Sequence, residues 1–211
     1  MKLLRHIMLK TTGVVLLAVS GIVLATPALS QPLAPLDKFV QVAGKAGLKF
    51  RLPSGFEAVE PDANAGMHYD LAIRCVGQPL ELRYIIQPLR MEEYTKSKRP
   101  GSKTVMSDPN QLFGPTLLVL AAHISGRNPA EIPTEAFGAA EVQKDFNASA
   151  GFTTAVKLDS KFGSGYRLAS VNILHKQDVS DAVVFCLCND MKTMNGQFFS
   201  RGDVFKALRF K

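Results

Sequence analysis

Two runs of alternating apolar and polar residues flank a short turn between residues 67 and 87. The turn is Gly77-Gln78-Pro79, and period-two alternation on both sides of a turn is typical of an antiparallel hairpin. The predicted apolar face comprises Met67, Tyr69, Leu71, Ile73, Cys75, Leu80, Leu82, Tyr84 and Ile86. Other elements must cover the apolar face, whereas the opposite face is largely polar. A tight turn would place Arg74 directly opposite Glu81, as a favourable cross-strand pair. The fold is therefore expected to contain an antiparallel sheet.

The rest of the chain after residue 30 mixes helical and strand patterns without an internal repeat. Helices are predicted within 31–45, at 111–124 (apolar nearly all round), at 134–148 with Thr134 as a candidate cap, and at 203–210. Strands are predicted at 47–52, 152–158, 166–175 and 179–188, and a charged loop at 91–110. These elements predict one α+β domain over 31–211, with helices packed against an antiparallel sheet.

The first thirty residues have the pattern of a secretory signal peptide. Three basic residues precede an apolar run over 13–25. That run is shorter than the ~20 apolar residues of a spanning helix. Ala28-Leu29-Ser30 fits a small-residue cleavage site, with Gln31 as the new N-terminus. The sequence therefore predicts a periplasmic or secreted protein with no stable membrane anchor after cleavage; the alternative is an uncleaved anchor.

The charge of the chain does not favour nucleic-acid binding. Lys and Arg total 25 and Asp and Glu total 18, which gives a net charge of +7. Removal of residues 1–30 leaves 22 basic and 18 acidic residues, a net charge of +4 that is ordinary for a soluble domain. The densest basic run, 96–99, lies in the predicted loop and favours a solvated loop over a phosphate or lipid contact.

Three cysteines follow the predicted signal peptide: Cys75, Cys186 and Cys188. An exported chain meets an oxidising compartment, so a disulfide between Cys75 and one of the other two is possible. The alternative is that all three are small buried hydrophobic residues. The C-x-C pair lacks the second pair of ligands that a zinc site needs, so no metal site is predicted there.

No recognisable catalytic motif is present, so no catalytic residue and no cofactor are predicted. The chain lacks a G-x-S-x-G elbow, an H-E-x-x-H pair and a phosphate-binding glycine loop. Candidate ligand-binding residues lie on the polar face of the hairpin: His68, Asp70, Arg74, Glu81 and Arg83. A histidine beside a carboxylate can serve acid–base or metal chemistry. The alternative is a solvated network of ion pairs.

The remaining histidines after residue 30 give this face no third metal ligand. His123 lies in the apolar run over 111–124, where a buried core histidine is expected. His175 ends a predicted strand beside Asp178, which suggests a role in a hairpin turn. No metal site is therefore predicted.

Two segments resemble the Mog1/PsbP-like fold. The first is Phe50-Arg51-Leu52-Pro53-Ser54-Gly55-Phe56, and the second is Val204-Phe205-Lys206-Ala207-Leu208-Arg209-Phe210. In that family similar segments open an antiparallel sheet and close the chain with a helix. The resemblance covers about residues 47–211, and segment 91–130 is longer than the family pattern. It implies an accessory or binding module rather than an enzyme, and it transfers no functional residue because fold alone does not carry function.

These observations predict an exported, non-enzymatic α+β domain that binds an unknown protein or small molecule. The alternatives are an exported enzyme of unrecognised type, and a secreted factor that contacts an envelope or host protein through segment 91–130. An enzyme predicts that His, carboxylate and Cys groups converge in one cleft. A protein contact through 91–130 predicts an exposed apolar patch.

Overall fold

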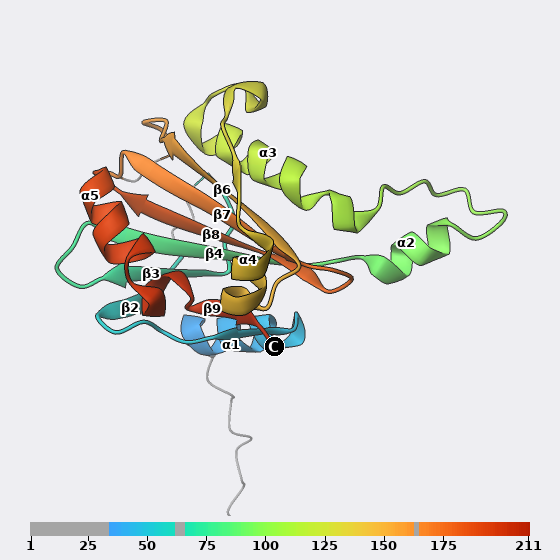
Figure 1. Cartoon of the computed structure of the whole chain (residues 1–211), viewed down its shortest axis with the longest axis horizontal. Coiled ribbons are helices and arrows are strands. Elements are labelled where there is room, and N and C mark those ends of the chain that lie inside the picture. The colour runs from blue at the N-terminus through green and yellow to red at the C-terminus, as the bar shows by residue number, and fades with distance from the viewer. Residues whose placement is uncertain (1–33, 62–65, 163–164) are drawn as a thin grey trace, which may run out of the picture. The chain divides into compact units, whose positions relative to one another are not determined.

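The computed structural model describes residues 34–61, 66–162 and 165–211. The predicted signal peptide over 1–30 lies outside the described residues. Within them, an antiparallel sheet with helices on both of its faces confirms the α+β class (Figure 1). No described helix has the length and apolar character needed to cross a membrane.

The main sheet has seven strands in the order β2-β3-β4-β8-β7-β6-β5, and all of its neighbours are antiparallel. Its strands are β2 (Phe56–Val59), β3 (Leu71–Cys75), β4 (Leu80–Pro88), β5 (Glu135–Ala136), β6 (Ala150–Lys157), β7 (Leu168–Lys176) and β8 (Ser180–Cys188). A second sheet pairs β1 (Leu48–Phe50) with β9 (Leu208–Phe210). The central strand β8 is buried at every position, as its apolar residues on both faces predicted.

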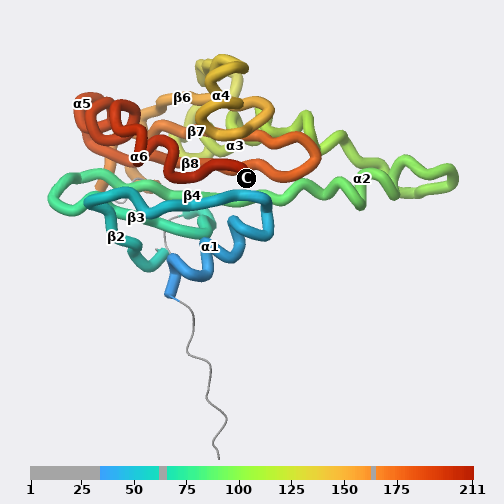
Figure 2. Tube along the Cα trace, turned by 60° about the horizontal axis from the view of Figure 1, so that its bottom comes forward, coloured from blue at the N-terminus to red at the C-terminus, as the bar shows by residue number. Residues whose placement is uncertain are grey.

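The helices are α1 (Pro35–Lys45), α2 (Met91–Ser97), α3 (Phe113–Ser125), α4 (Ala139–Phe146), α5 (Met191–Met194) and α6 (Gly202–Phe205). Short 3-10 turns occur at Pro109–Gln111 and Pro129–Glu131, and a π-helical turn at Asn195–Phe199. Figure 2 shows that α1 runs along β2 and β3, whereas α2 projects away from the sheet.

The sheet separates two hydrophobic cores. On the first face α1, α4, the segment from α5 to α6 and the β1–β9 pair cover the sheet, with Phe39, Phe146 and Phe210 fully buried among them. On the second face α3 packs on β6 and β7. Its buried stripe is Leu117, Ala121 and Ile124, which have helical spacing. Because α3 lies over β6 and β7, it does not cover the second face of β3 and β4, which is covered by other residues.

The predicted closing helix over 203–210 is wrong. The helix α6 ends at Phe205, and β9 then pairs with β1 so that Leu48 lies opposite Phe210. Leu208 and Phe210 are buried while Arg209 between them is exposed. Period-two burial therefore replaces the helical pattern, because pairing with β1 satisfies the backbone of a segment too short to be stable as a helix alone.

Three other sequence predictions need correction. The segment 91–110 is not entirely loop, since α2 occupies its first residues. The helix predicted over 134–148 begins only at Ala139, because β5 and Gly138 precede it and Thr134 caps nothing. The helix α3 is not buried all round, since Val119 is 61% exposed. The remaining predicted helices and strands occur within a few residues of their expected bounds.

Candidate functional site

The predicted hairpin is confirmed, and its register brings three of the candidate residues together. Arg74 on β3 lies directly opposite Glu81 on β4, as predicted. Arg83 follows Glu81 by two residues and so lies on the same face of β4. The Arg74 guanidinium donates to Glu81 Oε2 at 2.9 Å, and Arg83 Nε donates to Glu81 Oε1 at 2.7 Å. Both oxygens of Glu81 are therefore occupied by arginine donors.

This face of the hairpin is not the open polar surface that the alternation predicted. The side chains of Arg83 and Glu81 are 2% and 4% exposed, whereas that of Arg74 is 52% exposed. Ala72 and Ile85 on the same face are buried as well. The Arg83–Glu81 ion pair thus lies in the protein interior, where removal of one partner leaves an uncompensated charge.

Two tyrosines that were not among the candidates complete the cluster. The Arg83 guanidinium lies 4.8 Å from the ring centroid of Tyr69, in a cation–π contact. Tyr69 was predicted on the apolar face, but β3 begins only at Leu71 and the Tyr69 side chain packs in the second core. Tyr166, which lies just before β7, lines the same cluster. The alternation of the hairpin residues could not predict this contact, because Tyr166 is far away in the sequence.

A cavity of about 230 Å³ opens beside the ion pairs. Its lining residues are Val59, Glu60, Tyr69, Arg74, Glu81, Arg83 and Tyr166. Arg83 Nη1 is buried and has no hydrogen-bond partner among the described residues. Such an atom is unusual, because more than about 90% of buried polar groups have a partner and an unsatisfied one costs about 1–3 kcal/mol. Arg83, which lines the cavity, therefore carries one donor that nothing in the described chain satisfies.

Two members of the cluster, Tyr166 and Arg74, have raised pKa values. Burial raises the pKa of the Tyr166 phenol, and the negative charge of Glu81 raises it further, while Arg74 opposes both effects. The hydrogen bond to Glu81 raises the pKa of Arg74. At neutral pH the Tyr166 phenol is therefore neutral, and it lines the cavity together with the guanidinium groups of Arg74 and Arg83.

The other two candidates, His68 and Asp70, do not line this cavity. The His68 side chain is 88% exposed, and its Nε2 lies 3.7 Å from Asp70 Oδ1. Asp70 Oδ2 accepts a hydrogen bond of 2.7 Å from the backbone N–H of Ile86. Asp70 therefore fixes the start of the hairpin. No group of three His, Cys, Asp or Glu side chains suited to a metal ion occurs within 34–61, 66–162 and 165–211.

The remaining two histidines differ from expectation. His123 is exposed rather than buried in the core, and its Nε2 lies 3.0 Å from the carbonyl oxygen of Gly66. His175 is buried and pairs with Asp181 at 2.7 Å, not with Asp178. Its ring stacks on Phe113 with centroids 4.5 Å apart, so it anchors the start of α3.

All three cysteines are free and buried. Cys75 lies on β3, and Cys186 and Cys188 lie on β8, with β4 between them. Two strand spacings amount to roughly 10 Å, beyond the ~7 Å between Cα atoms that a disulfide spans. The possible bridge from Cys75 is therefore not formed. Burial raises the pKa of the Cys186 thiol, as expected for a packing residue.

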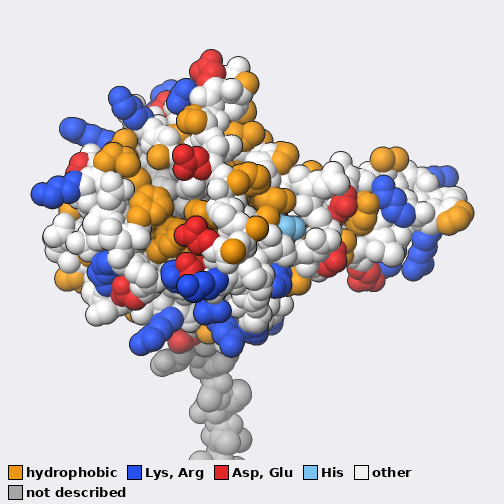
Figure 3. All heavy atoms as spheres, in the orientation of Figure 1, with side chains coloured by type: hydrophobic (Ala, Val, Ile, Leu, Met, Phe, Trp, Pro, Cys, Tyr) orange, Lys and Arg blue, Asp and Glu red, His pale blue; other side chains and the backbone are white. Residues whose placement is uncertain are grey.

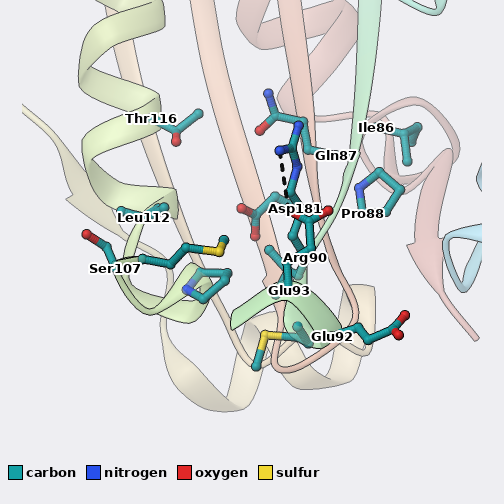
Figure 4. Close-up of a pocket in the computed structure, with 14 residues that line it drawn as sticks. Ile86, Gln87, Pro88, Arg90, Glu92, Glu93, Ser107, Leu112, Thr116 and Asp181 are labelled. Atoms are coloured by element: carbon teal, nitrogen blue, oxygen red, sulfur yellow. Dashed lines mark ion pairs between the residues drawn. The ribbon is translucent and has the colours of Figure 1, made fainter. Parts of the chain in front are cut away.

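A second hollow lies under residues 89–112, here called the arm. It has a volume of about 960 Å³ and lies between the end of β4, the start of β8 and the start of α3 (Figure 4). The base of the arm is fastened by two hydrogen bonds of 2.9 Å between Asn110 and Asp178. No residue of α2 is buried, and Val105 is 96% exposed. Figure 3 shows apolar and basic side chains side by side on the arm.

Comparisons with known proteins add a likeness of fold alone. No protein-family model and no curated protein matches the chain. Its structure is similar to the solution structure of cyanobacterial PsbP from Synechocystis, with a TM-score of 0.44 and 14% sequence identity over 79% of this chain and 88% of that one. The PsbP-like resemblance predicted from the sequence is confirmed as a weak likeness of fold, and no residue role is transferred from it.

Proposed function

We propose that this chain is an exported, non-enzymatic binding module of the periplasm or the cell exterior, and that the cavity beside Arg83 holds its ligand. Export is supported by the charged start, the apolar run over 13–25 and the small-residue exit of residues 1–30. The binding role rests on the cavity, and no catalytic step is assigned to it.

The observation that carries the proposal is the unpartnered Arg83 Nη1. Arg83 has one side of its guanidinium fixed by Glu81 and its face held against Tyr69, so the group is oriented before any ligand arrives. A preorganised donor beside a cavity is the feature that fixes the orientation of a ligand in a binding pocket. A ligand acceptor at Arg83 Nη1 would satisfy a buried donor that the described chain leaves without a partner; the Tyr84 hydroxyl, the other such atom among the described residues, lies in the first core.

An enzyme fits the geometry less well. Neither the cavity beside Arg83 nor the hollow under the arm is lined by histidine or cysteine. The cysteines lie in the first core, whereas His68 and His123 lie at the surface. The convergence of nucleophile, base and acid that an exported enzyme predicts is thus not found among the described residues.

The proposal is tested by ligand-induced stabilisation. Small-molecule extract from the exporting compartment is added to the purified protein and to two variants, Arg83→Lys and the matched control Arg209→Lys, at the exposed position of β9. Ligand at 100 times its Kd adds about 2.7 kcal/mol, which raises Tm by roughly 5–11 °C for a domain of this size. The protein and Arg209→Lys should show this rise, and Arg83→Lys should not. An equal rise in all three, or no rise in any, contradicts the proposal.

The arm supports a second candidate function, contact with an envelope or host protein. Val105 and Leu112 expose apolar side chains there, and the hollow under the arm adjoins Leu112. Exposed apolar residues gathered around a hollow are typical of interaction surfaces. This contact and a ligand in the cavity use different parts of the molecule, so either can be tested without the other.

A further inference from the structure

We infer that the ligand of the Arg83 cavity is a small monocarboxylate. This inference rests on the proposed function and specifies its ligand class. The carboxylate is either that of a free small acid or that of a peptide end, since both present the same group to an arginine.

The hydrogen-bond inventory of the cluster sets the first requirement. The carboxylate of Glu81 is saturated, because Arg74 donates to one oxygen and Arg83 to the other. The unpartnered atom is Arg83 Nη1, which can only donate. A ligand that satisfies this site must therefore bring an acceptor, and a cationic ligand would find the buried acceptor already taken.

The charges around the cavity set the second requirement. Arg83 and Glu81 neutralise each other, and Arg74 adds one positive charge at the cavity wall. Glu60 also lines the cavity, and solvent screens its charge as it screens that of Arg74, whose side chain is 52% exposed. A ligand with one negative charge can pair with the arginines at the least repulsion from Glu81 and Glu60, whereas a dianion such as phosphate would increase that repulsion. A single carboxylate is therefore favoured over phosphate.

The walls and the volume set the third requirement. The rings of Tyr69 and Tyr166 and the side chain of Val59 also line the cavity. Tyr69 contacts Arg83, and most of the cavity lining is polar, so a short body suits the cavity better than a large apolar one. About 230 Å³ is below the ~300–1,000 Å³ of pockets for drug-sized ligands, so the ligand is small. The neutral phenol of Tyr166 offers a second donor for the carboxylate.

The test uses the four tyrosines of the chain as reporters. Protein purified as the exporting cell produces it is labelled with 13C at tyrosine and titrated with benzoate, benzamide, inorganic phosphate and acetylphenylalanine. Benzamide is the matched neutral analogue of benzoate. Tyr69 and Tyr166 report on the cavity, while Tyr84 in the first core and Tyr94 on the arm are internal controls.

Benzoate should shift the Tyr69 and Tyr166 signals saturably and leave those of Tyr84 and Tyr94 unchanged. Benzamide and phosphate should bind at least about tenfold more weakly, because each lacks the singly charged carboxylate. Arg83→Lys should weaken benzoate binding by a similar factor, and Arg209→Lys should not. If acetylphenylalanine matches benzoate, a peptide end is the favoured source; if benzoate alone binds, the favoured source is a free acid.

Each other outcome overturns the inference. If benzamide or phosphate binds as well as benzoate, the ligand class is wrong while the cavity remains a ligand site. If no probe moves Tyr69 or Tyr166, the carboxylate inference is wrong. In that case the proposed function survives only if the compartment extract still stabilises the protein and fails to stabilise Arg83→Lys. The comparison of ligands uses the unaltered protein, so it holds even if Arg83→Lys does not fold.

Discussion

Removal of the Arg83 guanidinium while Glu81 stays in place is the sharpest test of the buried cluster. In Arg83→Met, Glu81 keeps its charge in a site where its side chain is 4% exposed, and it retains only the half-exposed Arg74 as a partner. Breaking a buried pair on one side costs about 3–5 kcal/mol, and the remaining bond to Arg74 places this case near the lower end. We expect a loss of about 3 kcal/mol, or roughly 6–12 °C in Tm.

The assay is urea unfolding of a four-member set: the unaltered protein, Arg83→Met, Glu81→Met and the double variant. The double variant removes both charges and should recover most of the loss, because a methionine pair of similar volume leaves no buried charge. Arg74→Met is the control. Its loss in the free energy of unfolding should stay under about 1 kcal/mol, because the Arg74 side chain of the Arg74–Glu81 pair is half exposed to solvent. A loss below about 1 kcal/mol for Arg83→Met, or additive losses in the double variant, would refute the assignment of a buried ion pair.

Four further predictions concern other parts of the chain. Export should remove residues 1–30, so protein recovered from the exporting compartment should begin at Gln31 by N-terminal sequencing; an intact start at Met1 would favour the uncleaved anchor. All three cysteines should resist a thiol reagent in the native state and react together after unfolding, and retention of a disulfide under those conditions would contradict the strand order. Phe210→Ala should cost about 3–5 kcal/mol in urea unfolding, because β9 seals the first core; a loss under about 1 kcal/mol would mean that β9 is dispensable. Replacement of Val105 and Leu112 by serine should change stability by less than about 0.5 kcal/mol and reduce cross-linking to an envelope or host protein; unchanged cross-linking would count against the arm as a contact surface.

Local patterns predicted the centre of the sheet well. The hairpin of β3 and β4 and its register at Arg74 and Glu81 follow from the alternation of apolar and polar side chains, which the pleat of a strand dictates. The fully buried β8 follows from its apolar residues on both faces. The predictions failed where a distant partner decides the conformation. The last residues have an apolar spacing that suits a helix, but pairing with β1 makes Leu208–Phe210 a strand.

The site was predicted only in part for a similar reason. Alternation placed Arg74, Glu81 and Arg83 on one face, and the structure confirms that they meet. Whether that face is solvated depends on what packs over it, and hairpin alternation carries no information about Tyr166, more than eighty residues further along the chain. His68 shares the alternation of the candidates, but it precedes the first residue of β3 and points into solvent.

The most direct test of the central claim is to identify what the protein carries from its own compartment. The unaltered protein, Arg83→Lys and Arg209→Lys are purified from the exporting compartment under native conditions, denatured, and their released small molecules compared by mass spectrometry. A carboxylic acid should accompany the unaltered protein and Arg209→Lys and be depleted from Arg83→Lys. Identical small-molecule profiles from all three proteins would contradict a ligand site at Arg83.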